Sequence, residues 1–270
     1  GDERAVDAVS RQLHHKDCQV RHVAMRALVK VAARGDERAV AAVAEHLEDV
    51  FPEVRYTAVK AMAQVADNKS AHAISSVISC LEDVDAFIRD AALEALTKVA
   101  KEGDERAIVA VAARLEHRDQ EVREAALEAM GRVAAVGDRT AIAACAARLE
   151  SHVPEVREMA VRALMKVSDI SDPTAVEAVG ERLLHRRAEV REVALKAMVK
   201  VATQGNALAV AAACKGLQHH RMDVRIHSLR ALVEVAKKGD SNALLAVTES
   251  LEDEDVNVRM AAKETYGLLC

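Results

Sequence analysis

Histidines are the side chains of this sequence best suited to metal chemistry. Seven of the eleven share three consecutive positions of a 34-residue period: His14, His15, His117, His152, His185, His219 and His220. Imidazole nitrogens bind zinc and other transition metals, but a site needs three or four oriented ligands. His185 and His219, one period apart, could share a metal only with further ligands beside them, and the spacing supplies none. The pattern favours solvated turn residues and predicts neither a metal nor another cofactor.

The candidate nucleophiles are five cysteines: Cys18, Cys80, Cys145, Cys214 and Cys270. They lie at least 56 residues apart and form no CxxC pair, so zinc and redox motifs are absent from the sequence. Cys18 is expected in a turn, whereas Cys145 and Cys214 fall where small apolar residues pack, and buried thiols are usually inert. Paired carboxylates such as Glu124 and Glu128 are ordinary neighbours on a solvated helix face. We predict no enzyme, and the odd number of free thiols indicates a reducing, intracellular compartment.

The composition is typical of an all-α protein. Only four residues are aromatic (Phe51, Tyr56, Phe87 and Tyr266), and three Pro and ten Gly remain for turns. Ala, which has the best helix propensity, is abundant together with Val and Leu. A formal net charge of −5 disfavours nucleic-acid binding. The longest run without a polar residue, Ala207–Cys214, is too short to predict a membrane span.

The spacing of two short motifs indicates tandem repeats. A Val-Arg or Ile-Arg pair recurs every 34 residues without insertion, at residues 20–21, 54–55, 88–89, 122–123, 156–157, 190–191, 224–225 and 258–259. Gly-Asp keeps the same step at Gly1, Gly35, Gly103, Gly137 and Gly239. A period of this length is typical of stacked repeat architectures. We therefore predict eight repeats over residues 1–34, 35–68, 69–102, 103–136, 137–170, 171–204, 205–238 and 239–270.

Each repeat is predicted to fold as two helices, as in Glu105–Glu116 and Glu121–Ala135. Apolar residues recur at helical spacing in both segments and make one buried stripe. The Gly of the Gly-Asp pair is expected to cap the preceding helix in a left-handed conformation, and the Asp to N-cap the next. One hairpin cannot bury its stripe alone, so neighbouring repeats must stack. The predicted fold is all-α: a right-handed α-solenoid (superhelix) of eight two-helix repeats, forming one domain over residues 1–270.

The repeat unit resembles a HEAT repeat. Its first helix closes on Leu-Glu-Asp and its second opens on Val-Arg-x-x-Ala, and it is most similar to the short HEAT-like repeats of phycobilisome lyases. Tetratricopeptide repeats share the period, but their aromatic and Gly-Tyr landmarks are missing here. The HEAT-like repeats of deoxyhypusine hydroxylase hold iron with His-Glu pairs. Glu45-His46 and Glu116-His117 have the reverse order, so that similarity fails.

In HEAT arrays, an Asp in the turn and an Arg of the second helix form a ladder between neighbouring repeats. The resemblance assigns this structural role to eight arginines: Arg21, Arg55, Arg89, Arg123, Arg157, Arg191, Arg225 and Arg259. The Asp is matched only by Asp49, Asp83 and Asp253, and His or Ser fills the slot elsewhere. We therefore expect a ladder that is incomplete or partly sensitive to pH.

The same resemblance implies that the second helices line the concave face, where a partner would bind. The candidate partner-binding residues are Glu124, Glu128, Glu158, Arg162, Lys166, Glu192, Lys196, Lys200, Ile226 and Met260. Acidic residues occupy one edge of this row and basic residues the other. Two interpretations remain open: a solvated face joined by i, i+4 pairs such as Glu158–Arg162, or a groove whose charge matches a partner.

These patterns predict a non-catalytic scaffold for protein–protein interaction. Val6, Val9 and Leu13 keep the internal apolar pattern, and Tyr266–Cys270 closes the sequence on apolar residues. Because such end repeats need covering, we expect a segment of a longer array or a subunit of a larger assembly. The alternative is a lyase-like accessory protein that binds a chromophore or its acceptor protein. A nucleic-acid-binding array is disfavoured, since no continuous basic stripe with stacking aromatics is present.

Overall fold

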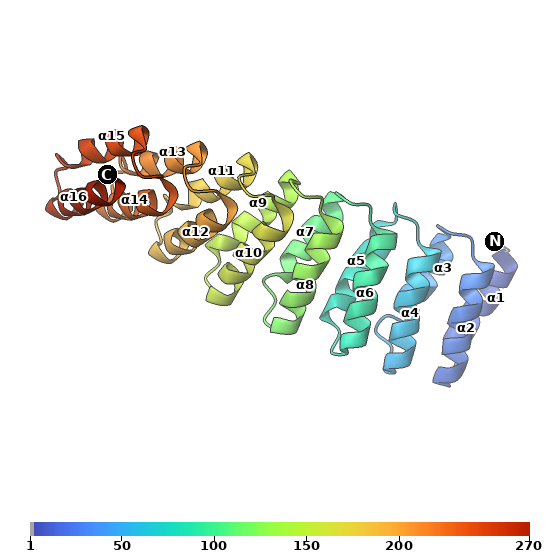
Figure 1. The fold of residues 1–270 in the computed structure, drawn as a ribbon. Coiled ribbons are helices and arrows are strands. Elements are labelled where there is room, and N and C mark those ends of the chain that lie inside the picture. Colours follow the sequence, from blue (N-terminus) through green and yellow to red (C-terminus); the bar gives the residue numbers. More distant parts are fainter. Residues whose placement is uncertain (1–2) are drawn as a thin grey trace. The chain divides into compact units, whose positions relative to one another are not determined.

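The computed structural model of the protein describes residues 3–270, and in this range it contains helices and no strand. The chain divides into two compact units, unit 1 over residues 1–135 and unit 2 over residues 136–270. In each unit consecutive helices pair into antiparallel hairpins (Figure 1). The predicted all-α repeat fold is confirmed.

None of the helices formed by residues 3–270 has both the length and the apolar character that crossing a bilayer requires.

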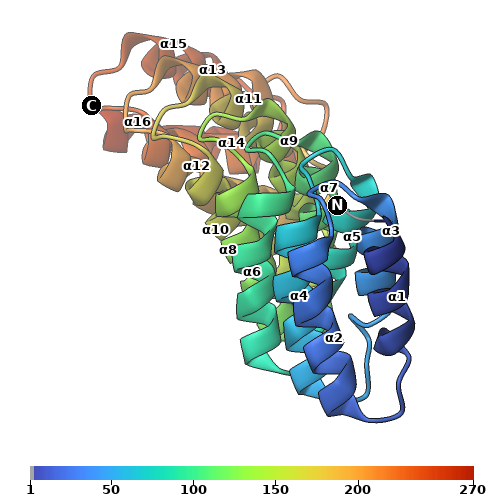
Figure 2. The same ribbon diagram turned by 90° about the vertical axis from the view of Figure 1, so that its right-hand side faces the viewer.

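Unit 1 contains four helical hairpins. Its helices are α1 (Glu3–Leu13), α2 (Cys18–Val31), α3 (Glu37–Ala44), α4 (Pro52–Val65), α5 (Ala71–Ser79), α6 (Ala86–Val99), α7 (Glu105–Arg114) and α8 (Gln120–Val133). A 3-10 turn, Cys80–Glu82, continues α5. The first helices of the hairpins form one layer and the second helices α2, α4, α6 and α8 form another (Figure 2).

The core of unit 1 lies between these two layers. The second helices contribute Met62, Leu96 and Met130. The 3-10 turn after α5 contributes Leu81, and the C-cap residue of α7 is Leu115; all five are fully buried. Burying one such side chain stabilises a protein by about 1.5–3 kcal/mol relative to leaving it in water. Because each hairpin covers the stripe of its neighbour, the fold depends on stacking rather than on any single repeat.

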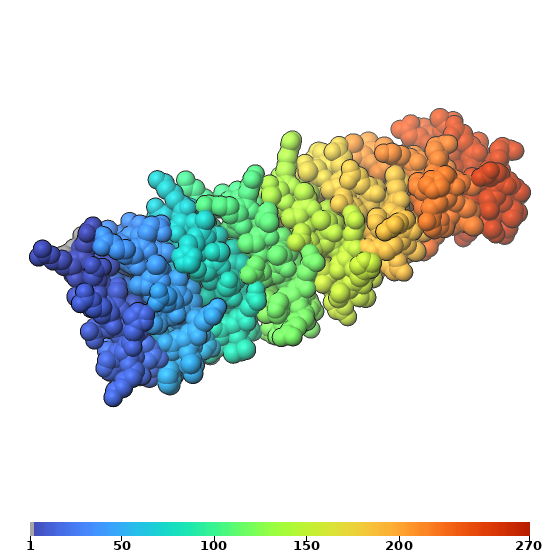
Figure 3. Space-filling model, turned by 180° about the vertical axis from the view of Figure 1, so that it is seen from behind, coloured from blue at the N-terminus to red at the C-terminus, as the bar shows by residue number. Residues whose placement is uncertain are grey.

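Unit 2 repeats the arrangement. Its helices are α9 (Arg139–Ala147), α10 (Pro154–Val167), α11 (Pro173–Arg182), α12 (Ala188–Val201), α13 (Ala207–Gly216), α14 (Met222–Val235), α15 (Ser241–Ser250) and α16 (Val256–Leu269). A 3-10 turn, Arg148–Glu150, follows α9. Leu164, Met198 and Leu232 from the second helices are fully buried. Side chains close the space between neighbouring hairpins of this unit, coloured yellow to red in Figure 3.

Side-chain oxygens begin the first helices, as the Gly-Asp motif predicts. The N-cap residues of α3, α5, α7, α9, α11, α13 and α15 are Asp36, Ser70, Asp104, Asp138, Asp172, Asn206 and Asp240. Each accepts a hydrogen bond from an otherwise unpaired backbone N–H of the first turn. Pro52, Pro154 and Pro173 stand at the first turn of their helices, where a missing N–H costs nothing.

The glycine of the same motif plays a different part from the predicted one. Gly35 has φ +85°, but α2 already ends at Val31, and its C-cap residue Ala32 is extended. The Gly35 N–H instead donates to the Val65 carbonyl at the end of α4, at 2.7 Å. The left-handed conformation of Gly35 therefore joins the loop that precedes the α3–α4 hairpin to the end of α4. The predicted role of this glycine as a cap of the preceding helix is wrong.

Two other sequence predictions need correction. Helices α7 and α8 end at Arg114 and Val133, two residues before the predicted ends, since each chain turn begins earlier than the apolar pattern indicates. Cys18 is the first residue of α2 and is half-buried rather than part of a turn. All five cysteines are free, and burial raises the pKa of Cys80 and Cys145 to about 12, which keeps both thiols protonated.

Candidate functional site

The arginines of the Val-Arg pairs hold the turn of their own hairpin. Arg123, for example, donates from Nη1 to the carbonyls of His117 and Arg118, at 2.8 and 2.9 Å. The same two bonds, to the carbonyls six and five residues earlier, are made by Arg21, Arg55, Arg89, Arg157, Arg191, Arg225 and Arg259. Arg123 is buried. These guanidinium groups are engaged by backbone and are poorly placed for a partner.

Three of these arginines also reach an aspartate of the next repeat. The pairs are Arg21–Asp49, Arg55–Asp83 and Arg225–Asp253, with closest distances of 2.8, 2.8 and 2.9 Å. Burial, the largest single influence, would raise the pKa of Asp49, but the hydrogen bonds from Arg21 and from the Phe51 backbone N–H, together with the nearby positive charge, outweigh it and the pKa is lowered. Asp49 is therefore charged, and the three ion pairs link neighbouring hairpins.

Other repeats replace the missing aspartate with an acid from a different position. Arg89 donates to Glu121 at 3.1 Å, and Arg191 donates to Asp223 at 2.9 Å. The pKa of Asp223 is lowered to about 2, first by its hydrogen bond from Arg221 and also by Arg191. The inter-repeat links thus continue at some turns where histidine occupies the aspartate slot.

The turn slot itself has one role whichever residue fills it. Its occupants are His15, Asp49, Asp83, His117, Ser151, His185, His219 and Asp253, and each accepts the backbone N–H of the residue two positions later. For His117 the acceptor is Nδ1, at 3.1 Å from the Asp119 nitrogen. In residues 3–270, no three His, Cys, Asp or Glu side chains converge as a metal site would require. The four histidines of this slot, His15, His117, His185 and His219, are part of the turn structure.

One histidine lies inside unit 2 instead of on its edge. His227 on α14 is only 4% exposed, and its Nε2 donates to the Arg191 carbonyl at 3.1 Å. Burial lowers the pKa of His227, and Glu192, whose carboxylate lies 3.6 Å from Nδ1, offsets this only in part. The folded protein therefore binds a proton at this site less readily than the unfolded chain does.

The stability of the protein should consequently fall as the pH drops below about 6.5, the ordinary histidine pKa. A lowered pKa means that stability present above pH 6.5 is lost as the pH falls toward the folded-state pKa. Valine, which fills the equivalent position as Val193 one repeat earlier, should remove this contribution. We expect His227→Val to flatten the dependence of the urea midpoint on pH between about 7 and 5. An unchanged dependence would assign the effect to other groups.

The candidate binding residues lie on the outward side of the second helices, which we call the second-helix surface. On α8 of unit 1, Glu128 is exposed and Glu124 half-buried. In unit 2 the exposed predicted residues are Glu158, Arg162, Glu192, Lys196, Lys200 and Met260, and Lys166 is half-buried. Ile226 was expected to be exposed but is half-buried, because α16 packs beside α14.

In unit 2 this surface contains a shallow groove of about 390 Å³ over α10, α12 and α14. Its floor is apolar and is made by Val161, Leu195 and Val199. Its rim is charged and carries Glu158, Glu192, Glu234, Lys196 and Lys200. Salt bridges cross the rim from Lys196 to Glu158 and from Arg230 to Glu192, at 3.0 and 3.1 Å. Because these pairs are exposed, each contributes no more than about 1 kcal/mol to stability, and a partner could replace them.

Unit 1 contains a second groove that the sequence analysis did not identify. It lies between α2 and α4, has a volume of about 440 Å³, and is lined by His22, Met25, Arg26, Val29, Lys30, Tyr56, Thr57, Lys60, Ala61 and Gln64. We call it the basic groove, because its lining includes three cations and no carboxylate. The sequence does contain evidence for the basic groove, because the second helices of the first two repeats lack the acidic edge that the central repeats carry.

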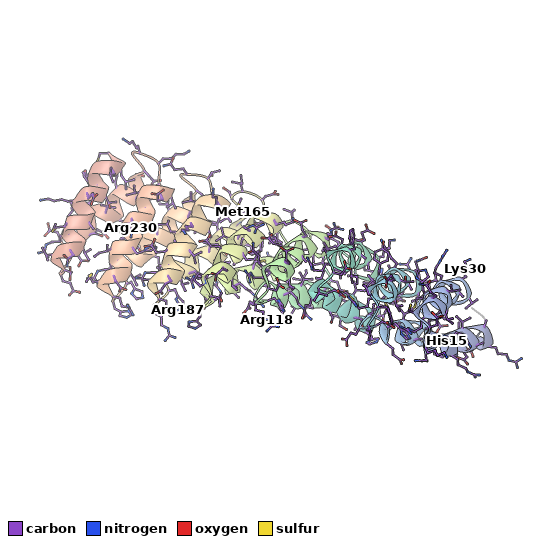
Figure 4. The ribbon with its side chains drawn as sticks, turned by 90° about the horizontal axis from the view of Figure 1, so that it is seen from below. His15, Lys30, Arg118, Met165, Arg187 and Arg230 are labelled. Carbon is purple, nitrogen blue, oxygen red and sulfur yellow. The ribbon has the colours of Figure 1, made fainter. Side chains whose placement is uncertain are left out.

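The cations of the basic groove differ in their partners. Lys60 forms a salt bridge with Glu94 and lies over the Tyr56 ring, 5.7 Å from its centroid. Arg26 and Lys30 are exposed and form no ion pair with any residue between 3 and 270. Lys30 points away from the ribbon of α2 in Figure 4. Two unpaired cations thus stand beside an apolar floor made by Met25, Val29 and Ala61.

Comparison with known protein families agrees with the repeat architecture. The sequence model described as HEAT repeats matches residues 45–131 and 108–199. Among solved structures, the chain is similar to the complex of CpcE and CpcF of phycocyanin lyase from Nostoc sp. PCC7120, at 22% identity and a TM-score of 0.39, covering 92% of this chain and 94% of that chain. It is also similar to human deoxyhypusine hydroxylase, at 19% identity and a TM-score of 0.38, covering 99% and 96%. No curated protein matches the sequence.

Proposed function

The chain belongs to the HEAT-repeat family, and from that premise we propose that it is a non-catalytic scaffold that binds protein partners on its second-helix surface. The basic groove of unit 1 carries this proposal. It combines an apolar floor with two exposed cations that have no partner in residues 3–270. Such a groove suits a peptide segment that places one large apolar side chain between acidic residues.

The charges of the groove are not needed by the repeat fold. The position of Arg26 is filled elsewhere by Lys60, Glu94, Glu128, Arg162, Lys196, Arg230 and Glu264. The position of Lys30 is filled by Gln64, Lys98, Arg132, Lys166, Lys200, Glu234 and Leu268. The position of Arg26 accepts either sign of charge, and the position of Lys30 accepts even an apolar residue. The packing of the repeats therefore does not require a cation at either position. Binding is the physical role left to Arg26 and Lys30.

The mixed rim of the unit 2 groove supports the same function with a different preference. Val199 is exposed on its floor, and Lys200 forms no ion pair with the described residues. Both acidic and basic residues line that groove, which favours a partner of mixed charge. Unit 1 and unit 2 would thereby bind different partner segments, as a scaffold does.

Selection from a random peptide library displayed on phage tests the proposal. We expect wild-type protein to enrich peptides with acidic residues around one large apolar residue. Their affinity, measured by fluorescence anisotropy, should fall about ten-fold or more in Arg26→Glu/Lys30→Glu, because each reversal turns an attraction into a repulsion. The thermal midpoint should stay nearly unchanged, since both side chains are exposed.

The matched control reverses two exposed cations away from the groove, Arg11 on α1 and Lys101 in the loop after α6. Arg11→Glu/Lys101→Glu should bind the selected peptides like wild type. A selection that enriches no such peptide, or equal affinity for both double variants, would contradict the assignment of binding to the basic groove.

A further inference from the structure

Two neighbouring turns of unit 1 expose large apolar side chains to solvent. Val50 and Val84 are 86% and 92% exposed, and Phe87 is 75% exposed. With Phe51 they form what we call the apolar turn edge, which contains both phenylalanines of the chain. A single exposed apolar residue is ordinary, but a cluster of large apolar side chains that stays in water marks an interaction surface.

The fold does not require apolar residues at these positions. The slot of Val50 and Val84 is filled in the other repeats by Lys16, Arg118, His152, Arg186, His220 and Glu254. The slot of Phe87 is filled by Gln19, Glu53, Glu121, Glu155, Glu189, Asp223 and Asn257. Every one of these replacements is polar, and the turns are held by the arginine and slot hydrogen bonds described above. Structure alone therefore gives no reason for Val84 or Phe87.

The four side chains lie close enough together for one partner segment to cover. They belong to turns that begin α4 and α6, which pack against each other, and packed helices lie about 8–10 Å apart. His15 and Arg118, at the corresponding turns of α2 and α8, project from the same edge of unit 1 in Figure 4. An amphipathic helix presents apolar residues at i, i+4 and i+7 over a similar span.

The charge around the apolar turn edge is acidic. The segments Glu48–Glu53 and Glu82–Phe87 contain six acidic residues and no basic one. Arg21 and Arg55 balance Asp49 and Asp83, whereas exposed Glu48 and Glu53 form no ion pair with the described residues. This charge would repel an anionic membrane surface or a nucleic acid and would attract a cationic segment.

We infer that the apolar turn edge is a second docking surface, which binds a basic amphipathic helix of a protein partner. The apolar face of that helix covers Val50, Val84 and Phe87, and its Lys or Arg residues meet Glu48 and Glu53. This surface is distinct from the basic groove, which has the opposite charge and lies on the second-helix surface. One chain can then hold an acidic and a basic segment at once.

The test uses the full chain and a synthetic fluorescein-labelled peptide of roughly 14 residues, four helical turns, with Leu on one face and Lys on the other. Fluorescence anisotropy should show binding that weakens with salt. Val84→Arg/Phe87→Glu, which installs the residues of the next repeat at Arg118 and Glu121, should weaken it by about ten-fold or more. The thermal midpoint should be preserved, because a neighbouring turn already tolerates both residues.

Four controls make the result specific. Val109→Arg changes another exposed valine of unit 1, on α7, and should bind the peptide like wild type. Arg26→Glu/Lys30→Glu should also bind it normally, which separates this surface from the basic groove. A peptide with Glu in place of Lys should not bind to Arg26→Glu/Lys30→Glu, in which the basic groove can no longer hold an acidic segment. A Lys peptide of the same composition in scrambled order should not bind to the wild type.

Four results would overturn the inference. The first is equal affinity of Val84→Arg/Phe87→Glu and wild type for the basic peptide. The second is equal binding of the Lys and Glu peptides by Arg26→Glu/Lys30→Glu, in which the basic groove is disabled. The third is sedimentation with phosphatidylcholine vesicles that the double variant abolishes, which would make the edge a membrane contact. The fourth is wild-type dimerisation in analytical ultracentrifugation that the double variant abolishes, which would make the occupant a second copy of the chain.

Discussion

The Arg55→Ala variant is expected to lose about 3–5 kcal/mol of the free energy of unfolding of unit 1. Arg55 donates two hydrogen bonds to the Asp83 carboxylate, at 2.8 and 3.0 Å, and one to the Asp49 carbonyl at 3.0 Å. The two side chains are only 14% and 9% exposed. Alanine would leave the Asp83 charge buried without its cation, and an uncompensated buried charge is one of the most destabilising defects in a protein. Urea unfolding followed by circular dichroism measures the loss.

The matched control is Arg89→Ala in the next repeat. Arg89 makes the same turn bonds, to the carbonyls of Asp83 and Val84, but its acidic partner Glu121 is largely exposed. Water can solvate Glu121 after the substitution, so the loss should be nearer 1.5–2 kcal/mol, about the value of hydrogen bonds from a charged donor. Equal losses in the two variants would show that the turn carbonyls, and not the buried ion pair, account for the stability.

The contrast between these arginines shows what a repeat period can predict. The 34-residue spacing placed Arg55 and Arg89 at the same position, and both make the same turn bonds. Those bonds reach the arginine's own repeat, so local sequence determines them. The acid that each arginine meets belongs to the next repeat and varies with the residue found there. Local geometry was therefore predictable, and the strength of each link was not.

The predicted helix cap and the predicted side-chain exposure were wrong for the same physical reason. Gly35 was expected to cap α2, but its N–H bonds to Val65, 30 residues later, and no local rule identifies such a partner. Ile226 was expected in solvent because its helical position points outward, and the neighbouring helix α16 half-covers it. Contacts between segments distant in sequence decided both outcomes.

The candidate binding surfaces were predictable in position but not in shape. Outward positions of the second helices could be read from helical periodicity, and Lys196 and Lys200 are exposed there. The grooves depend on how deep the floor lies between two helices, which follows from the sizes of side chains such as Val29 and Ala61. The apolar turn edge could have been found by comparing repeats, since Val84 stands where other turns carry charge.

The same comparison between repeats identifies two residues inside unit 2, Ser228 and Gly216, whose sizes compensate for each other. Ser228 on α14 fills a position that is alanine in the seven other repeats: Ala24, Ala58, Ala92, Ala126, Ala160, Ala194 and Ala262. Its side chain is fully buried, and its hydroxyl has no hydrogen-bond partner among the described residues. Opposite it stands Gly216, where a Cβ atom would lie 2.0 Å from the Ser228 Oγ. The glycine makes room for the hydroxyl.

Two single substitutions should therefore act in opposite directions. Ser228→Ala should stabilise unit 2 by about 1 kcal/mol, because a buried hydroxyl without a partner costs free energy that a methyl group does not. Gly216→Ala should destabilise it by about 1–3 kcal/mol, since the added methyl group overpacks the site. Alanine is a better helix former than glycine by about 1 kcal/mol, but Gly216 ends α13, so little of that gain applies.

The double variant Gly216→Ala/Ser228→Ala tests whether the two substitutions affect stability through the same space or independently. Removing the hydroxyl removes the nearest obstacle to the new methyl group, and the next one, the Leu184 Cδ2 atom at 2.8 Å, is the end of a flexible side chain. The free energy of unfolding of the double variant should then exceed the value expected from adding the two single effects, by a coupling energy of about 1 kcal/mol or more. Urea unfolding measures the three variants and the wild type. Additive effects would mean that the two residues do not share the space. In that case the cost of Gly216→Ala would come from Leu184 or the Ser228 Cβ atom, and alanine at position 228 would give no relief.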